Sequence, residues 1–91
     1  MEVIIDNKKY EVIKNEKDCL DASDLEGKIT EYFDNFDYIL GDYAYGKVRL
    51  KGFNDKDNKY FKPVNDITKV DKYIEDYCAY GCKYFILKKE K

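Results

Sequence analysis

The sequence predicts an α+β fold: a mostly antiparallel sheet of about five strands with two helices. Three observations lead there. A chain of 91 residues has room for one hydrophobic core. Short β-branched and aromatic runs, bounded by turn residues, are typical of strands. Two longer segments space apolar residues three or four apart, as helices do. We expect the order β-β-α-β-β-α-β, with both helices against one face of the sheet and residues 1–91 forming a single domain.

The first two strands form a predicted hairpin. Glu2–Ile5 and Tyr10–Ile13 are short β-branched runs, and the polar segment Asp6–Lys9 lies between them. Polar residues between two such runs are typical of a hairpin turn, so we expect antiparallel pairing there.

The first predicted helix begins near Ser23, whose hydroxyl can cap the amide three residues later. Glu26 stands where a capping-box carboxylate reaches back. The apolar stripe that should face the core consists of Leu25, Ile29, Tyr32, Phe33 and Phe36. Gly27 weakens this helix by up to about 1 kcal/mol relative to alanine.

A second hairpin is predicted from Phe36–Leu40 and Lys47–Lys51, joined by the glycine-flanked connection Gly41–Gly46. Because strand side chains alternate between faces, the cations at positions 47, 49 and 51 should share one face.

The C-terminal part predicts a helix followed by a central strand. After the polar loop Asn54–Asn58, Pro63 fixes an irregular segment, and Thr68 and Asp71 give a weak capping signal. The stripe of this helix is Val70, Tyr73, Ile74, Tyr77 and Cys78, and Gly81 can close the helix. The last strand, Cys82–Leu87, is apolar on both faces and should therefore be central.

Composition narrows the class of protein. Hydrophobic residues make up 44% of the chain and charged residues 40%, and no apolar run approaches the roughly 20 residues that span a bilayer. The N-terminus lacks the basic and apolar regions of a signal peptide, so we expect a cytoplasmic protein with no membrane partner. Three cysteines without a secretion signal are expected to be reduced thiols.

The formal charge of −2 conceals an asymmetry between the halves of the chain. Residues 1–46 carry five lysines and twelve acids, a net −7, whereas residues 47–91 carry twelve basic residues and seven acids, a net +5. This division indicates either an interaction surface or charges that complement each other within the fold.

Two long segments carry a resemblance to a known family. They are Asp37–Phe53, which includes Gly41-Asp42 and Tyr45-Gly46, and Tyr77–Lys88, which includes Tyr80-Gly81-Cys82. Together they resemble the two signature stretches of the YutD-like family of bacterial (Firmicutes) proteins, and the resemblance covers most of the chain. The family typically has Trp-Gly where this chain has Tyr43-Ala44. It has no established activity, so the resemblance implies a fold but no catalytic or ligand residues.

Catalytic and metal chemistry are not favoured by the sequence. Without histidine, the commonest general base and metal ligand is missing, so we expect no enzyme activity and no cofactor. Cys78 and Cys82 could supply two thiolates, but a structural zinc usually needs four ligands, and only Cys19 remains. We therefore expect no metal site and cysteines that serve as small packing residues. A redox pair of Cys78 and Cys82 is the lesser alternative.

The strongest binding hypothesis is a basic and aromatic strand surface that binds RNA or a ribonucleoprotein. Cations for phosphates and rings for bases are the elements with which sheet surfaces bind single-stranded RNA. The candidate residues are Tyr43, Tyr45, Lys47, Arg49, Lys51 and Phe53. Arg49 is the single arginine among sixteen lysines, and its planar fork suits bidentate recognition.

Three alternatives stay open at this stage. The strand can present an ordinary solvated face, with Arg49 paired to Asp37 or Asp42 across the hairpin. The chain can be a protein-interaction adaptor, with acidic residues around Asp34, Asp37 and Asp42 contacting a basic partner. It can also be a small thiol switch or enzyme that uses its last two cysteines.

Overall fold

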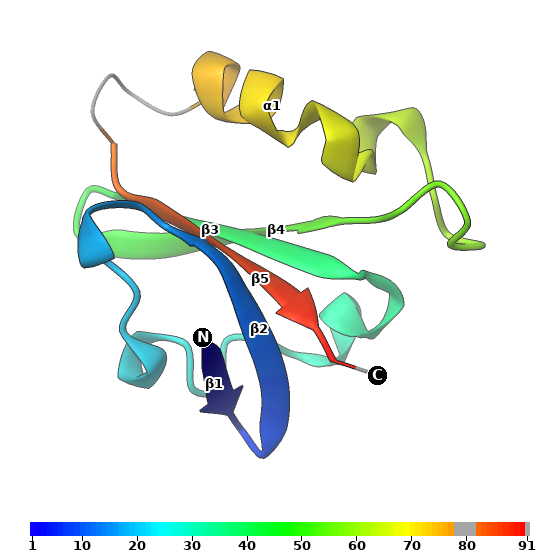
Figure 1. Cartoon of the computed structure of the whole chain (residues 1–91). Coiled ribbons are helices and arrows are strands. Elements are labelled where there is room, and N and C mark those ends of the chain that lie inside the picture. Colours follow the sequence, from blue (N-terminus) through cyan, green and yellow to red (C-terminus); the bar gives the residue numbers. More distant parts are fainter. Residues whose placement is uncertain (78–81, 91) are drawn as a thin grey trace.

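The computed structural model describes residues 1–77 and 82–90, and Figure 1 shows their arrangement. The strands are β1 (Glu2–Ile5), β2 (Lys8–Asn15), β3 (Tyr38–Ala44), β4 (Lys47–Phe53) and β5 (Tyr84–Lys89). The α-helix is α1 (Val70–Tyr77), and the short 3-10 helices are η1 (Glu16–Asp18), η2 (Ala22–Asp24), η3 (Glu31–Asn35), η4 (Pro63–Asn65) and η5 (Ile67–Lys69). The five strands form one antiparallel sheet in the order β1-β2-β5-β3-β4.

The central position predicted for the last strand is confirmed. β5 pairs with β2 on one side and with β3 on the other. The first hairpin is confirmed too, with a tighter turn than expected, because Ile5 already pairs with Lys8. Asp6 and Asn7 both have positive φ, 51° and 66°, which gives the primed turn that matches the twist of hairpin strands.

The prediction of an α-helix from Ser23 through Phe36 is wrong, and so is the order β-β-α-β-β-α-β. The segment forms η2, a turn and η3 instead. Gly27 has φ of +76° and Thr30 is extended, so the backbone leaves the helical region twice. The cap is Asp21, whose side chain accepts a hydrogen bond from the Ser23 amide; the predicted capping box is not formed.

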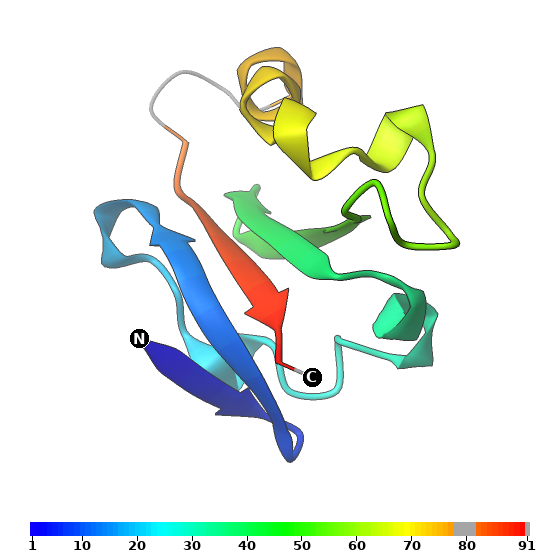
Figure 2. The same cartoon turned by 45° about the vertical axis from the view of Figure 1, so that its right-hand side comes forward.

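The two sides of the sheet are covered by different segments, which corrects the expectation of two helices on one face. α1 lies over one side, and the cyan segment containing η2 lies on the other (Figure 1). The view in Figure 2 shows the same layers turned by 45°. The predicted stripe still supplies core residues, since Leu25, Ile29 and Phe33 are buried. A chain of tight turns thus replaces the first helix as a covering layer.

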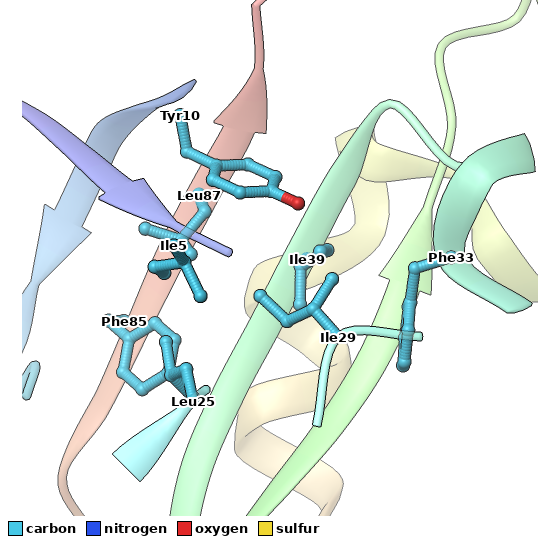
Figure 3. Close-up of a cluster of buried hydrophobic side chains, with 8 residues drawn as sticks. All are labelled: Ile5, Tyr10, Leu25, Ile29, Phe33, Ile39, Phe85 and Leu87. Carbon is cyan, nitrogen blue, oxygen red and sulfur yellow. The ribbon is translucent and has the colours of Figure 1, made fainter. Parts of the chain in front are cut away.

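The larger core lies beneath this covering segment (Figure 3). Its buried members are Ile5, Tyr10, Leu25, Ile29, Phe33, Ile39, Phe85 and Leu87. Phe85 stands directly opposite Gly41 in the β3–β5 register, and its ring occupies the space where a Cβ on that glycine would lie. Gly41 therefore belongs to the interior of β3, and the connection predicted over Gly41–Gly46 is shorter in the structure.

α1 covers the smaller core on the opposite side. Val70, Tyr73 and Ile74 pack against Leu40, Phe53 and Ile86, as the stripe predicts for its first three members. The prediction that Tyr77 lies in the core is wrong, because this side chain is 64% exposed. Its ring stacks on Tyr73 with 4.6 Å between ring centroids. The predicted packing of Cys78 and the predicted helix end at Gly81 concern residues outside the described ones. Within the described residues, no helix is long and apolar enough to cross a membrane.

Candidate protein-binding groove

The β3–β4 hairpin positions the residues that the sequence predicted as a binding surface. Its turn is Tyr45-Gly46, both with positive φ of 54° and 74°, and Ala44 pairs with Lys47. This register sets the alternation of β4, so that Lys47, Arg49, Lys51 and Phe53 lie on the α1 side of the sheet.

Arg49 is held by Asp42, its direct cross-strand neighbour. Its Nε donates to Oδ1 at 2.9 Å and its Nη2 to Oδ2 at 2.7 Å. The carboxylate is 8% exposed and the guanidinium 54% exposed. Bidentate pairs of this kind are among the stronger hydrogen bonds in proteins. The planar fork thus binds a carboxylate within the fold, which is one of the pairings that the sequence left open.

The three rings of the predicted surface, Tyr43, Tyr45 and Phe53, do not gather on one face. Phe53 is buried beneath α1, in edge contact with Tyr73 at 5.5 Å. Tyr43 lies on the opposite side, where its hydroxyl donates to Asp24 at 3.2 Å; burial and then this hydrogen bond raise the pKa of Tyr43 to about 12. Tyr45 is fully exposed at the turn. Lys51 lies 5.1 Å above the Phe53 ring, so its nearest aromatic partners belong to the fold itself.

Sequence reasoning missed a groove beside the same strand. Two adjoining hollows, of about 440 and 460 Å³, share Lys51 and Val64; we call them together the β4 groove. The first is lined by Glu31, Tyr32, Asn35, Phe36, Lys51, Tyr60, Lys62, Val64 and Asn65. The second is lined by Lys51, Phe53, Pro63, Val64, Asp66, Lys69, Lys72, Tyr73, Asp76 and Tyr77. Four large apolar side chains are exposed here: Tyr32 (68%), Tyr60 (44%), Val64 (73%) and Tyr77 (64%).

The lining of the β4 groove carries a small excess of positive charge. Its four lysines are Lys51, Lys62, Lys69 and Lys72, and its three acids are Glu31, Asp66 and Asp76, a net +1 in a protein of net −2. Lys72 is paired with Asp76 at 3.5 Å. Lys51, Lys62 and Lys69 take part in none of the ion pairs found among residues 1–77 and 82–90. A groove that combines exposed rings with a small excess of positive charge is suited to an acidic partner.

The described residues offer little for metal or thiol chemistry. Among residues 1–77 and 82–90, no cluster of three or more His, Cys, Asp or Glu side chains could hold a metal ion. Burial raises the pKa of the Cys19 thiol, which disfavours the reactive thiolate. Cys82 is a partly exposed free thiol. The pairing of Cys82 with Cys78 falls outside the described residues.

Comparisons with known proteins agree with this fold. Residues 4–88 match the family model described as "Putative antitoxin YutD-like". A Bacillus subtilis (strain 168) protein named "Putative antitoxin YutD" is 37% identical over 87 residues, which cover 96% of each chain. The solution NMR structure of protein yutD from B. subtilis superposes with a TM-score of 0.77 at 35% identity, covering 100% of this chain and 83% of that one. The chain belongs to the YutD-like family.

Proposed function

We propose that this chain is a non-catalytic binding module that recognises a partner protein through the β4 groove, in the manner of an antitoxin. The observation that carries the proposal is the gathering of Tyr32, Tyr60, Val64 and Tyr77 around two adjoining hollows. Contiguous exposed apolar surface on a small protein is typical of an interaction site. Tyrosine is also enriched in protein–protein interfaces, where its ring packs and its hydroxyl stays hydrated.

Charge supports an acidic surface as the complement of this groove. Lys51, Lys62 and Lys69 place positive charge around the exposed rings. The opposing charges are Glu31 in the first hollow and Asp66 and Asp76 in the second, and Asp76 is paired with Lys72. Complementary charge increases the association rate and selects among partners. The names of the family and of the B. subtilis relative contain the word antitoxin, which favours a toxin protein as the partner.

RNA is the competing partner, and the geometry supports it less well. Asp42 holds the Arg49 fork, Phe53 is buried, and Tyr43 lies on the other side of the sheet. The rings of the predicted RNA surface are therefore dispersed, although its three cations share the α1 side of the sheet. The sequence pI of about 5.2 also departs from the strongly basic character that is typical of nucleic-acid-binding domains.

A site-specific photocrosslinker distinguishes the two partners. We would place a photoreactive phenylalanine at Tyr60, on the groove, and separately at Ile4, which is 64% exposed on β1. The proposal predicts an adduct in cells at position 60 that protease destroys and ribonuclease leaves intact. The matched position 4 should give no such adduct. An adduct at position 60 that ribonuclease destroys would establish RNA as the ligand instead.

Growth then tests the antitoxin part of the proposal. The crosslinked protein, expressed alone, should slow growth, and co-expression of the wild-type chain should restore it. A variant with Tyr32→Ala and Tyr60→Ala removes two exposed rings, so it should fold normally and fail to restore growth. If the partner binds the groove but does not slow growth, the chain is a binding module and the antitoxin role is excluded.

A further inference from the structure

β4 is an edge of the sheet, and the directions of its backbone groups follow from one hydrogen bond. The Tyr43 amide donates to the Lys83 carbonyl at 3.4 Å, so the odd-numbered residues of β3 bond towards β5. The even-numbered residues of β3 then bond to the odd-numbered residues of β4, because bonding directions alternate along an antiparallel strand. The amides and carbonyls of Val48 and Leu50 consequently point away from the sheet.

The chain itself already uses this outer side at one position. The Asn54 amide donates to the Asn65 carbonyl at 2.7 Å, and the Ile67 amide donates to the Asn54 carbonyl at 3.1 Å. These bonds form a parallel bridge between Asn54 and Asp66. One isolated parallel bridge therefore extends the pairing just beyond the C-terminal end of β4. Towards Lys47, no other described segment pairs with the outer side of β4.

The first hollow of the β4 groove continues this open edge. Lys51 lines it from β4 itself, Asn65 from the bridging segment, and Phe36 from the opposite side of the sheet, where its ring packs against Gly52. A strand laid beside β4 would thus run from Val48 into the first hollow. Lys47 and Lys51 would flank it on the α1 side.

We propose that the partner contributes an extended, acidic segment that pairs with the outer edge of β4 as an additional strand. This inference rests on the proposed function and specifies how that partner binds. Addition of a strand to an exposed edge provides main-chain hydrogen bonds, and side-chain contacts provide selectivity. Acidic side chains opposite Lys47 and Lys51 would form favourable cross-strand pairs. The same two lysines disfavour pairing between the β4 edges of two copies, as edge lysines commonly do.

Amide hydrogen exchange of the whole chain tests the inference without any variant. The probe is a seven-residue peptide of alternating glutamate and valine, matched to the length of β4, and its lysine–valine counterpart is the control. With the acidic peptide at millimolar concentration, the Val48 and Leu50 amides should exchange at least severalfold more slowly. The Arg49 amide, which already bonds to β3, should change little. Unchanged exchange at both outward amides, or equal protection by the basic peptide, would overturn the inference.

A proline substitution supplies the second measurement. Val48→Pro removes one outward donor, whereas Val48→Ala retains it, and proline is tolerated in edge strands where its nitrogen faces solvent. The loss of one hydrogen bond should weaken peptide binding about 2- to 12-fold in the proline variant relative to the alanine variant. Protein crosslinking at Tyr60 without protection of Val48 and Leu50 by the crosslinked partner would refute the strand and leave the proposed function intact. Absence of any protein adduct at Tyr60 would refute the proposed function.

Discussion

Replacing Arg49 separates a structural role of the arginine from a role in binding. Arg49→Lys keeps the positive charge but loses the fork that forms two hydrogen bonds to Asp42. A lysine can reproduce one of these bonds, so the loss is one hydrogen bond to a charged group, worth about 1.5–3 kcal/mol when fully buried. Because the Arg49 side chain is 54% exposed, we expect a loss near the lower end, about 1–2 kcal/mol.

Arg49→Met should lower the free energy of unfolding more, by about 2–3 kcal/mol. It removes the guanidinium from an Asp42 carboxylate whose side chain is only 8% exposed. Urea titration followed by circular dichroism measures both losses, and the slope of the transition should stay constant. In a domain of this size, each 1 kcal/mol also lowers the melting temperature by about 4–8 °C. Lys47→Met is the matched control: this lysine is exposed on the same strand, and its removal should change stability by less than about 0.5 kcal/mol.

A double-mutant cycle isolates the pair. Asp42→Asn keeps the shape of the side chain, and combined with Arg49→Met it should cost about 1 kcal/mol less than the two single changes together. Additive losses would show that the ion pair is not the source of the destabilisation. Stability that is unaffected by Arg49→Lys and Arg49→Met would refute the structural role.

Three further predictions concern other parts of the fold. Gly41→Ala should lower the free energy of unfolding by about 1–3 kcal/mol, because the new methyl group meets the Phe85 ring. Chemical denaturation measures this loss, and an unchanged midpoint would contradict the packing of Phe85 on Gly41. Burial and the hydrogen bond to Asp24 raise the pKa of Tyr43 above its value in the unfolded chain. The contribution of the neutral Tyr43 hydroxyl to folding stability is therefore complete below about pH 10 and is lost as the pH rises towards about 12. That contribution is at most about 2.7 kcal/mol, and Tyr43→Phe should flatten the alkaline limb of a stability–pH curve. The Cys19 thiol should react with a thiol reagent much more slowly in the native protein than in urea, and equal rates would refute its protection.

The strands were more predictable from the sequence than the first helix. Alternation has a period of two residues, and the faces of β4 follow from it directly. In the segment after Ser23, apolar spacing correctly indicated the buried side chains of Leu25, Ile29 and Phe33. It could not specify the backbone, because successive tight turns bury the same residues once Gly27 adopts a positive φ.

The candidate site was less predictable because it depends on register and on distant segments. Sequence alone left Arg49 facing Asp37 or Asp42, and the two-residue turn at Tyr45-Gly46 decides for Asp42. The β4 groove draws Tyr32 from η3, Tyr60 from a loop and Val64 from η4. Tyr32 is 28 residues from Tyr60 in the sequence, and no periodicity links η3 to the segment that contains Tyr60 and Val64.

The Asn54 bonds also bear on how tightly the groove can bind. The buried Asn54 side chain accepts hydrogen bonds from the Asp37 amide at 2.8 Å and from Asn58 at 3.1 Å. Its main chain bonds to Asn65 at the end of η4 and to Ile67 at the start of η5. One residue therefore joins the start of β3, the end of β4 and the wall of the groove. A wall fixed in this way loses little conformational entropy when a partner binds, so more of the contact energy appears as affinity. The bridge between Asn54 and Asp66 also favours an incoming strand, because the segment around Asp66, which that strand would meet, is already aligned with β4.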